Sequence, residues 1–185
     1  ALTRVFKAIP DAAGRYRVIS QWIDPPVSVL ASGAYTVMDR DGNFFQPKGL
    51  EIRRFNDRAP GLLTSPMTNP ARFALPASSA LPGDAIVALN LTYDGWLVFA
   101  TEQGVIGALS RDFKQFDAIR LGPDEEISNT IAIDESGGIY IVTAQRMHRV
   151  QWTGSNLSLD PSTGAWTAPY DPGPAVPAPG RLGPG

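Results

Sequence analysis

Two stretches near the middle of the chain read alike, namely Ala88-Leu-Asn-Leu-Thr-Tyr-Asp-Gly-Trp-Leu-Val-Phe-Ala-Thr101 and Thr130-Ile-Ala-Ile-Asp-Glu-Ser-Gly-Gly-Ile-Tyr-Ile-Val-Thr143. Each begins with alternating apolar and polar residues, which is typical of a half-buried strand. A glycine turn follows, and then a continuous apolar run that indicates a strand covered on both faces. The turn glycines Gly95 and Gly138 lie 43 positions apart. That interval is about the length of one four-stranded sheet in a radial β-repeat.

The repeat extends in both directions. Further strands are expected at 105–109, 116–121 and 147–152, and a weaker copy spans 35–45 and 50–55. A hairpin is also expected from 5–9 and 16–22. These patterns predict an all-β chain of about four β-propeller blades, each an antiparallel four-stranded sheet.

Chain length limits the size of the ring. At roughly 43 residues per blade, 185 residues supply about four blades, whereas closed propellers commonly have six to eight. We therefore expect an incomplete ring and a companion polypeptide that completes it. A compact four-bladed or sandwich-like β domain is the alternative.

The whole chain, 1–185, is interpreted as a single propeller portion. Residues 59–83 are rich in Pro, Ala and Ser and are expected to form an irregular excursion or lid. Residues 169–185 hold many prolines and glycines and are expected to form an extended tail.

Composition excludes several classes of function. A net charge of −2 with scattered basic residues argues against nucleic acid, since phosphate binding needs clustered Lys and Arg. The absence of cysteine excludes disulfides and thiolate catalysis. No apolar run reaches the roughly 20 residues that span a bilayer, so no membrane span is expected. A periplasmic or extracellular location is expected, and a cytoplasmic one stays open.

The segment Ser128-Asn-Thr-Ile-Ala-Ile-Asp-Glu-Ser-Gly-Gly-Ile-Tyr-Ile-Val142 resembles blades of the six-bladed gluconolactonase and strictosidine synthase superfamily, and the likeness covers about 85–152. In the calcium-dependent lactonases of that superfamily an Asn at this strand start binds the metal. The resemblance therefore implies calcium at Asn129, with Glu125 or Glu126 as neighbouring ligands. Val87 stands at the matching position of the preceding blade and cannot bind metal. Further ligands would lie outside this chain.

Each of these residues has a structural interpretation as well. Asn129 is equally suited to capping a strand, and the acidic cluster at 124–126 to a solvated turn. His148, the single histidine, falls on an alternating strand and is expected to be structural, either at the solvent or between blades. Asp39-Arg-Asp-Gly-Asn43 imitates the start of a calcium loop, but Leu50 holds the twelfth position, so a hairpin turn is expected.

Three functions fit these patterns. The first is a propeller that binds a small-molecule ligand at its central channel, with hydrolysis of an ester, lactone or amide as the finer prediction. The second is a non-catalytic interaction or scaffold propeller. The third is one chain of a self-cleaved N-terminal-nucleophile amidohydrolase, with cleavage after Gly185.

Overall fold

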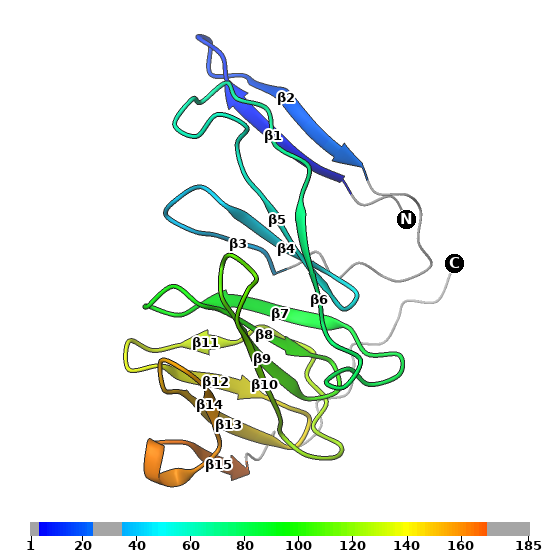
Figure 1. Cartoon of the computed structure of the whole chain (residues 1–185), viewed down its shortest axis with the longest axis vertical. Helices are drawn as coiled ribbons and strands as arrows, with labels where there is room; N and C mark the ends of the chain where they lie inside the picture. The colour runs from blue at the N-terminus through cyan, green and yellow to red at the C-terminus, as the bar shows by residue number, and fades with distance from the viewer. Residues whose placement is uncertain (1–3, 24–34, 170–185) are drawn as a thin grey trace, which may run out of the picture.

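The computed structural model describes residues 4–23 and 35–169, which form an all-β chain (Figure 1). Its strands form a two-stranded N-terminal hairpin and three larger antiparallel sheets, here called blades 1, 2 and 3.

The hairpin is β1 (Arg4–Pro10) and β2 (Tyr16–Ile23). Blade 1 is β3 (Val37–Met38), β4 (Phe44–Lys48), β5 (Glu51–Phe55) and β6 (Ala71–Ala74). Blade 2 is β7 (Ile86–Leu91), β8 (Leu97–Thr101), β9 (Val105–Leu109) and β10 (Phe116–Arg120). Blade 3 is β11 (Ala132–Ile133), β12 (Gly138–Val142), β13 (Arg146–Trp152), β14 (Leu157–Ser158) and β15 (Trp166–Pro169).

Within each blade the strands lie side by side in chain order. Blade 3 divides its fourth strand in two, because β14 pairs with one end of β13 and β15 with the other. A short 3₁₀ turn, Pro161–Thr163, separates β14 from β15, with Asp160 capping its start and Gly164 ending it in the left-handed conformation. That turn is the one helical element among the described residues.

The blades stack face to face, with blade 1 below the hairpin and blade 3 at the bottom of Figure 1. The first strand β7 of blade 2 contacts both β3 and β11, the first strands of its neighbours. First strands therefore gather on one side, as the inner strands of a propeller do. The predicted all-β architecture of antiparallel blades in an unclosed ring is confirmed, and the described residues supply three blades and a hairpin.

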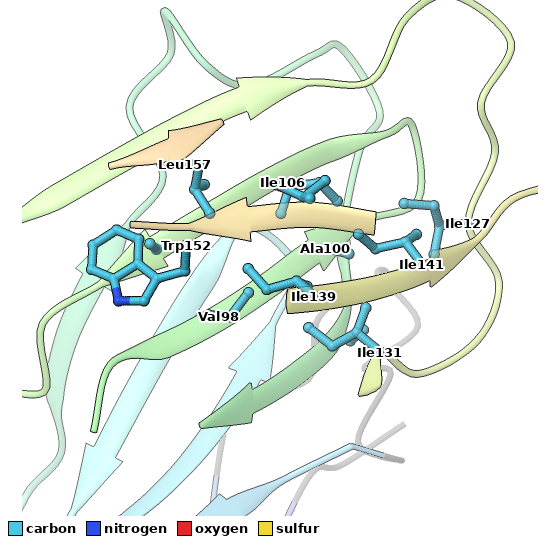
Figure 2. Packing of buried hydrophobic residues seen from close by; sticks show 12 residues of the cluster. Val98, Ala100, Ile106, Ile127, Ile131, Ile139, Ile141, Trp152 and Leu157 are labelled. Carbon is cyan, nitrogen blue, oxygen red and sulfur yellow. The ribbon is translucent and has the colours of Figure 1, made fainter. Parts of the chain in front are cut away.

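Alternate faces of the second strand in blade 2 pack against different neighbours. Val98 and Ala100 join the cluster shared with blade 3, whereas Leu97 and Phe99 join the cluster shared with blade 1. Figure 2 shows the cluster shared with blade 3, in which Ile139 and Ile141 of β12 face these residues. All four residues of the 97–100 run are fully buried. The continuous apolar run thus marks a strand covered on both sides, as the sequence predicts.

The turn between first and second strands is the same in all three blades. The side chain of Asp39, Thr92 or Asp134 accepts backbone N–H groups of its own turn, at distances between 2.7 and 3.0 Å. A glycine with positive φ then completes the turn, and these glycines are Gly42, Gly95 and Gly137. The sequence interpretation placed the third one at Gly138, which instead begins β12 and pairs with Gln151. Of the two adjacent glycines, Gly137 and not Gly138 adopts the left-handed conformation that favours glycine.

The sequence interpretation expected residues 59–83 to be irregular throughout, but the structure has a strand within them. Strand β6 lies inside them and pairs with β5 as the fourth strand of blade 1. Its sequence, Ala71-Arg-Phe-Ala74, is short and carries one large apolar residue, so the periodicity was too weak to show it. The expected Pro/Gly tail, 169–185, lies outside the described residues after Pro169.

One position links each blade to the element before it. Phe55, Leu109 and Val150 occupy the same register on the third strands, since they pair with Phe44, Leu97 and Ile139. Two residues further on lie Asp57, Arg111 and Trp152.

Each of these three side chains makes a polar contact with the preceding element. Lys7 of the hairpin donates to Asp57 at 2.7 Å, and Trp152 Nε1 donates to Asp94 in the turn of blade 2 at 2.9 Å. Arg111 donates to Asp39 and Asp41 in the turn of blade 1, both at 2.9 Å. The same position on the third strand thus joins each blade to the preceding element, through a carboxylate at Asp57, a guanidinium at Arg111 and an indole N–H at Trp152.

Candidate functional site

The starts of the first strands in blades 1 and 3 meet at one polar cluster. The hydroxyl of Tyr35, just before β3, donates a hydrogen bond of 2.7 Å to Oδ1 of Asn129, just before β11. The backbone N–H of Thr130 donates to the same oxygen at 2.8 Å. Asn129 is exposed and Tyr35 is half-buried, so a solute can reach both. We call Tyr35, Asn129 and Thr130 the inner-strand cluster.

Blade 2 supports this cluster from the side. The amide nitrogen of Asn90 on β7 donates to the carbonyl oxygen of Ile131 at 3.0 Å, and its Oδ1 accepts from Leu91 N–H at 2.8 Å. Ile131 is buried in the core shared by blades 2 and 3. Asn90 therefore fixes the segment that carries Asn129, which makes it a positioning residue rather than a ligand-binding one.

The inner-strand cluster is made of hydroxyl, amide and backbone groups. Asn129 spends its side-chain oxygen on Tyr35 and Thr130, and no bond from its NH₂ group to another described residue is seen. Such groups donate and accept hydrogen bonds without titrating near neutral pH. The cluster is thus suited to hold a neutral polar ligand, and it offers no general base of its own.

Glu125, predicted as a neighbouring ligand, lies instead between blades 2 and 3 and is nearly fully buried. Its carboxylate contacts Arg146 at 3.0 Å, the Thr143 hydroxyl at 2.5 Å and Nε2 of His148 at 3.3 Å. Burial by itself raises the pKa of Glu125. The hydrogen bond from Thr143, the facing ring of His148 and the charge of Arg146 outweigh that effect, so the pKa of Glu125 lies below its ordinary value.

His148 is a structural residue in this arrangement. It is buried on the third strand of blade 3, with Nδ1 3.0 Å from the Thr167 hydroxyl and Nε2 facing Glu125. The sequence interpretation allowed a blade interface or solvent, and the structure places the ring at the interface. Since β11 and β12 lie between β13 and the inner edge of the blade, His148 does not belong to the inner-strand cluster.

Glu126 is exposed, and its carbonyl oxygen accepts from Ala144 N–H at 2.9 Å. The structure therefore does not gather Asn129, Glu125 and Glu126 around one point. In the part of the chain that is described, no group of three or more His, Cys, Asp or Glu side chains is placed to hold a metal ion. Calcium at Asn129 stays a prediction that requires ligands from elsewhere.

Sequence reasoning missed Tyr35 and Asn90 as members of this region. Tyr35 was visible only as the first residue of the weak third repeat, and Asn90 only as a polar residue on an alternating strand. A signal did exist: Tyr35 precedes the first strand of one repeat and Asn90 lies in the first strand of the next. A propeller brings the first strands of its blades together around the centre.

Comparison with known proteins supports the fold and leaves the function open. No family model matches the chain. An uncharacterised protein of Archaeoglobus fulgidus is 39% identical over 158 residues, covering 83% of this chain and 28% of the relative. The chain thus spans less than a third of that relative's length.

Two solved structures show the same fold. Virginiamycin B lyase from Staphylococcus aureus matches with a TM-score of 0.56 at 13% identity, over 83% of this chain and 47% of the lyase chain. A protein from Lactobacillus plantarum matches with a TM-score of 0.58 at 16% identity, over 84% of this chain and 47% of its own. These neighbours are β-propeller-like, which agrees with the blades described above. Separately, the described residues contain no helix long and apolar enough to cross a membrane.

Proposed function

We propose that this chain is the part of a β-propeller that binds a small, neutral, polar ligand at the inner-strand cluster. The observation that supports the proposal is the hydrogen bond between Tyr35 and Asn129, which joins the starts of first strands from two blades that are not adjacent. Blade 2 lies between them, so the contact requires the three blades to converge. Ligand sites of propellers and barrels occur where such strand ends converge.

The chemistry of the cluster narrows the ligand class. Because Thr130 N–H and the Tyr35 hydroxyl already donate to Asn129 Oδ1, the groups left for a ligand are the Asn129 NH₂, which donates, and the Tyr35 oxygen, which accepts. Such a pair recognises carbonyl and hydroxyl groups, as found in lactones, amides and sugars. No carboxylate or histidine is part of the cluster, so ionic ligands find no partner charge there. Asn129, with its NH₂ group directed to no other described residue, is the group that would donate to a ligand carbonyl.

Hydrolysis is the finer form of the proposal. Attack on an ester, lactone or amide needs a base within about 3 Å of the attacking water. Among the described residues, His148 and Glu125 are engaged with one another between blades and are not available for this step. The inner-strand cluster itself contains no acid–base group, so hydrolysis would need one from outside the cluster, and a bound calcium ion would need further ligands.

The amidohydrolase alternative concerns Gly185, which lies outside the described residues. The scaffold alternative predicts that the inner-strand cluster binds nothing. Ligand titration separates that alternative from the proposal directly.

The test is a titration of the ¹⁵N-labelled full chain, followed by NMR. The probes are D-glucono-1,5-lactone, N-acetylglucosamine and calcium chloride, each taken to about 20 mM to capture weak binding. We expect the lactone or the sugar amide to shift the signals of Tyr35, Asn129 and Thr130. Tyr35→Phe and Asn129→Ala should each weaken that binding about fivefold to tenfold, the worth of one hydrogen bond.

The control is Tyr93→Phe, which alters an exposed tyrosine in the turn of blade 2, and it should change affinity less than twofold. If no probe shifts the cluster signals, or if both cluster variants bind as the unaltered chain does, the proposal is wrong. A shift of Asn129 by calcium alone would support the metal prediction.

A further inference from the structure

A groove separates the N-terminal hairpin from blade 1. It encloses about 630 Å³, and the described residues that line it include Val5, Met38, Phe44, Gln46, Phe55 and Leu63. One wall is strand β1 and the other is the sheet face of β3, β4 and β5. Met38 is 65% exposed and Leu63 is 66% exposed, so apolar surface is open here. Open apolar surface of this kind marks a place where something else packs.

The same sheet position is covered in the next two blades. Phe44 and Gln46 of blade 1 correspond in register to Leu97 and Phe99 of blade 2 and to Ile139 and Ile141 of blade 3. The four residues in blades 2 and 3 are fully buried, whereas Phe44 is only half-buried.

The first two strands of the preceding blade supply the cover. Phe45 from β4 packs with Leu97 and Phe99 of blade 2, and Val98 and Ala100 from β8 pack with Ile139 and Ile141 of blade 3. Figure 2 shows the latter contact. By the same rule, a first and a second strand are expected over this face of blade 1, where Phe44 is half-buried and Gln46 is buried without a partner for its Oε1. Among the described residues, the strands that precede blade 1 are β1 and β2, and they do not lie at this inner position.

The hairpin sits where the outer strands of a blade would lie. Lys7 of β1 is paired with Asp57, just beyond β5, and Ser20 of β2 accepts from Met67 N–H at 3.1 Å. Both contacts are with the loop that leads to β6, the outermost strand of blade 1. The other edge of β1 pairs with no described strand. Its unpaired backbone N–H and C=O groups offer a template for another strand.

Gln46 gives an independent indication of an absent partner. The residue is only 5% exposed, it lines the groove, and its Oε1 has no hydrogen-bond partner among the described residues. Its counterparts in blades 2 and 3 are the apolar Phe99 and Ile141. A buried acceptor without a donor costs about 1–3 kcal/mol, so such atoms are normally satisfied. A donor from an added strand would satisfy it.

We propose that this groove is the docking site for a two-stranded β-hairpin of a companion polypeptide, which supplies the inner half of the blade whose outer half is β1 and β2. One strand of the incoming hairpin pairs with the free edge of β1. Its apolar face covers the half-buried Phe44 and the exposed Met38, whereas Phe55 is already covered by Trp22 of β2, and it donates to Gln46. The archaeal relative continues well beyond the part that this chain matches, since the match covers only 28% of its length. The site goes beyond the ligand-binding proposal and does not depend on it.

The test uses the ¹⁵N-labelled full chain and a synthetic peptide of residues 85–102, which contains β7 and β8. This hairpin already covers the matching face of blade 3, so it has the chemistry that the proposal requires. We expect NMR shift changes in β1, β4 and β5, with slower hydrogen exchange at the free edge of β1. Met38→Lys should weaken binding about tenfold, because it places a charge in the apolar groove.

Two controls accompany this measurement. Val142→Lys, at a 46% exposed strand position in blade 3, should change affinity less than twofold. Tyr35→Phe should leave peptide binding unchanged, so failure of the ligand site and of the groove remain distinguishable. Both charge variants replace exposed residues, and folding is checked by their spectra.

Three results would overturn the proposal. The peptide could fail to perturb β1 and blade 1, or bind equally well to Met38→Lys. The amides on the edge of β1 that faces away from β2 could already be protected in the isolated monomer, in which case a segment of the same chain covers the groove. The chain could instead form a dimer with these amides protected, in which case a second copy is the occupant.

Discussion

The three turn glycines provide a matched test of how the blades fit together. Gly42, Gly95 and Gly137 have φ angles of +79°, +89° and +83°, so an alanine at each meets nearly the same backbone strain. Their surroundings differ. An added Cβ meets nothing within 4 Å at Gly42, and at Gly95 only the flexible guanidinium of Arg111 at 3.5 Å. At Gly137 it would overlap the carbonyl oxygen of Trp152 and lie 2.9 Å from Gln151 Nε2.

The structure gives the expected magnitudes. Left-handed backbone costs a non-glycine residue about 1–2 kcal/mol, which is the whole effect expected for Gly42→Ala and Gly95→Ala. Gly137→Ala adds a steric overlap with backbone that cannot move freely, because the N–H of Trp152 donates to the Gly137 carbonyl at 2.8 Å. Overpacking of this kind costs a further 1–3 kcal/mol, so the total should be about 2–5 kcal/mol.

Urea unfolding of the full chain, followed by tryptophan fluorescence, measures these differences. The expected order of destabilisation is Gly137→Ala above both Gly42→Ala and Gly95→Ala, which should agree within about 0.5 kcal/mol. Equal losses in all three variants would show that the close approach of the Gly137 turn to β13 is wrong. The packing argument for blade 3 would then fail with it.

Two further predictions concern the junction between blades 2 and 3. Glu125→Gln should lower the unfolding free energy at pH 7 by about 2 kcal/mol, because it removes a buried carboxylate that holds Arg146. Since the pKa of Glu125 in the folded chain is below its ordinary value of 4.5, the stabilisation by its carboxylate is complete above that pH and is lost as the pH falls. Urea titrations at several pH values should therefore show the difference in unfolding free energy between the unaltered chain and Glu125→Gln closing at low pH. A difference that stays constant with pH would contradict this prediction. Trp152→Phe removes the hydrogen bond to Asp94 and should lower the unfolding free energy by about 1–2 kcal/mol. A double-mutant cycle with Asp94→Ala should give a coupling energy near 1 kcal/mol. Strictly additive losses would exclude this contact.

Local pattern was enough to place most strands. The sequence interpretation expected a strand at 105–109, and β9 spans Val105–Leu109. It expected hairpin strands at 5–9 and 16–22; β1 is one residue longer at each end, and β2 is one residue longer at its C-terminal end. Such agreement arises because alternation and turn glycines act over a few neighbouring residues. Strand β6 escaped because its four residues carry too little periodicity.

The site was harder to predict because it depends on residues far apart in sequence. Asn129 was singled out by a resemblance, but its partner Tyr35 lies 94 positions away. Glu125 seemed a ligand because it precedes a first strand, yet its side chain turns into the interface where Arg146 and His148 meet it. The direction of a loop side chain is set by packing against another blade, which no local pattern encodes.

By itself, the sequence determined the repeating unit of this protein, because strand alternation, turn chemistry and the buried run at 97–100 are all local. Only the tertiary structure decided what lies between the units. It brought Tyr35 to Asn129, used Asp57, Arg111 and Trp152 as links, and left a groove between blade 1 and β1. The physical reason is that contacts between blades join residues distant in the chain, and each depends on which neighbour is present to be packed against.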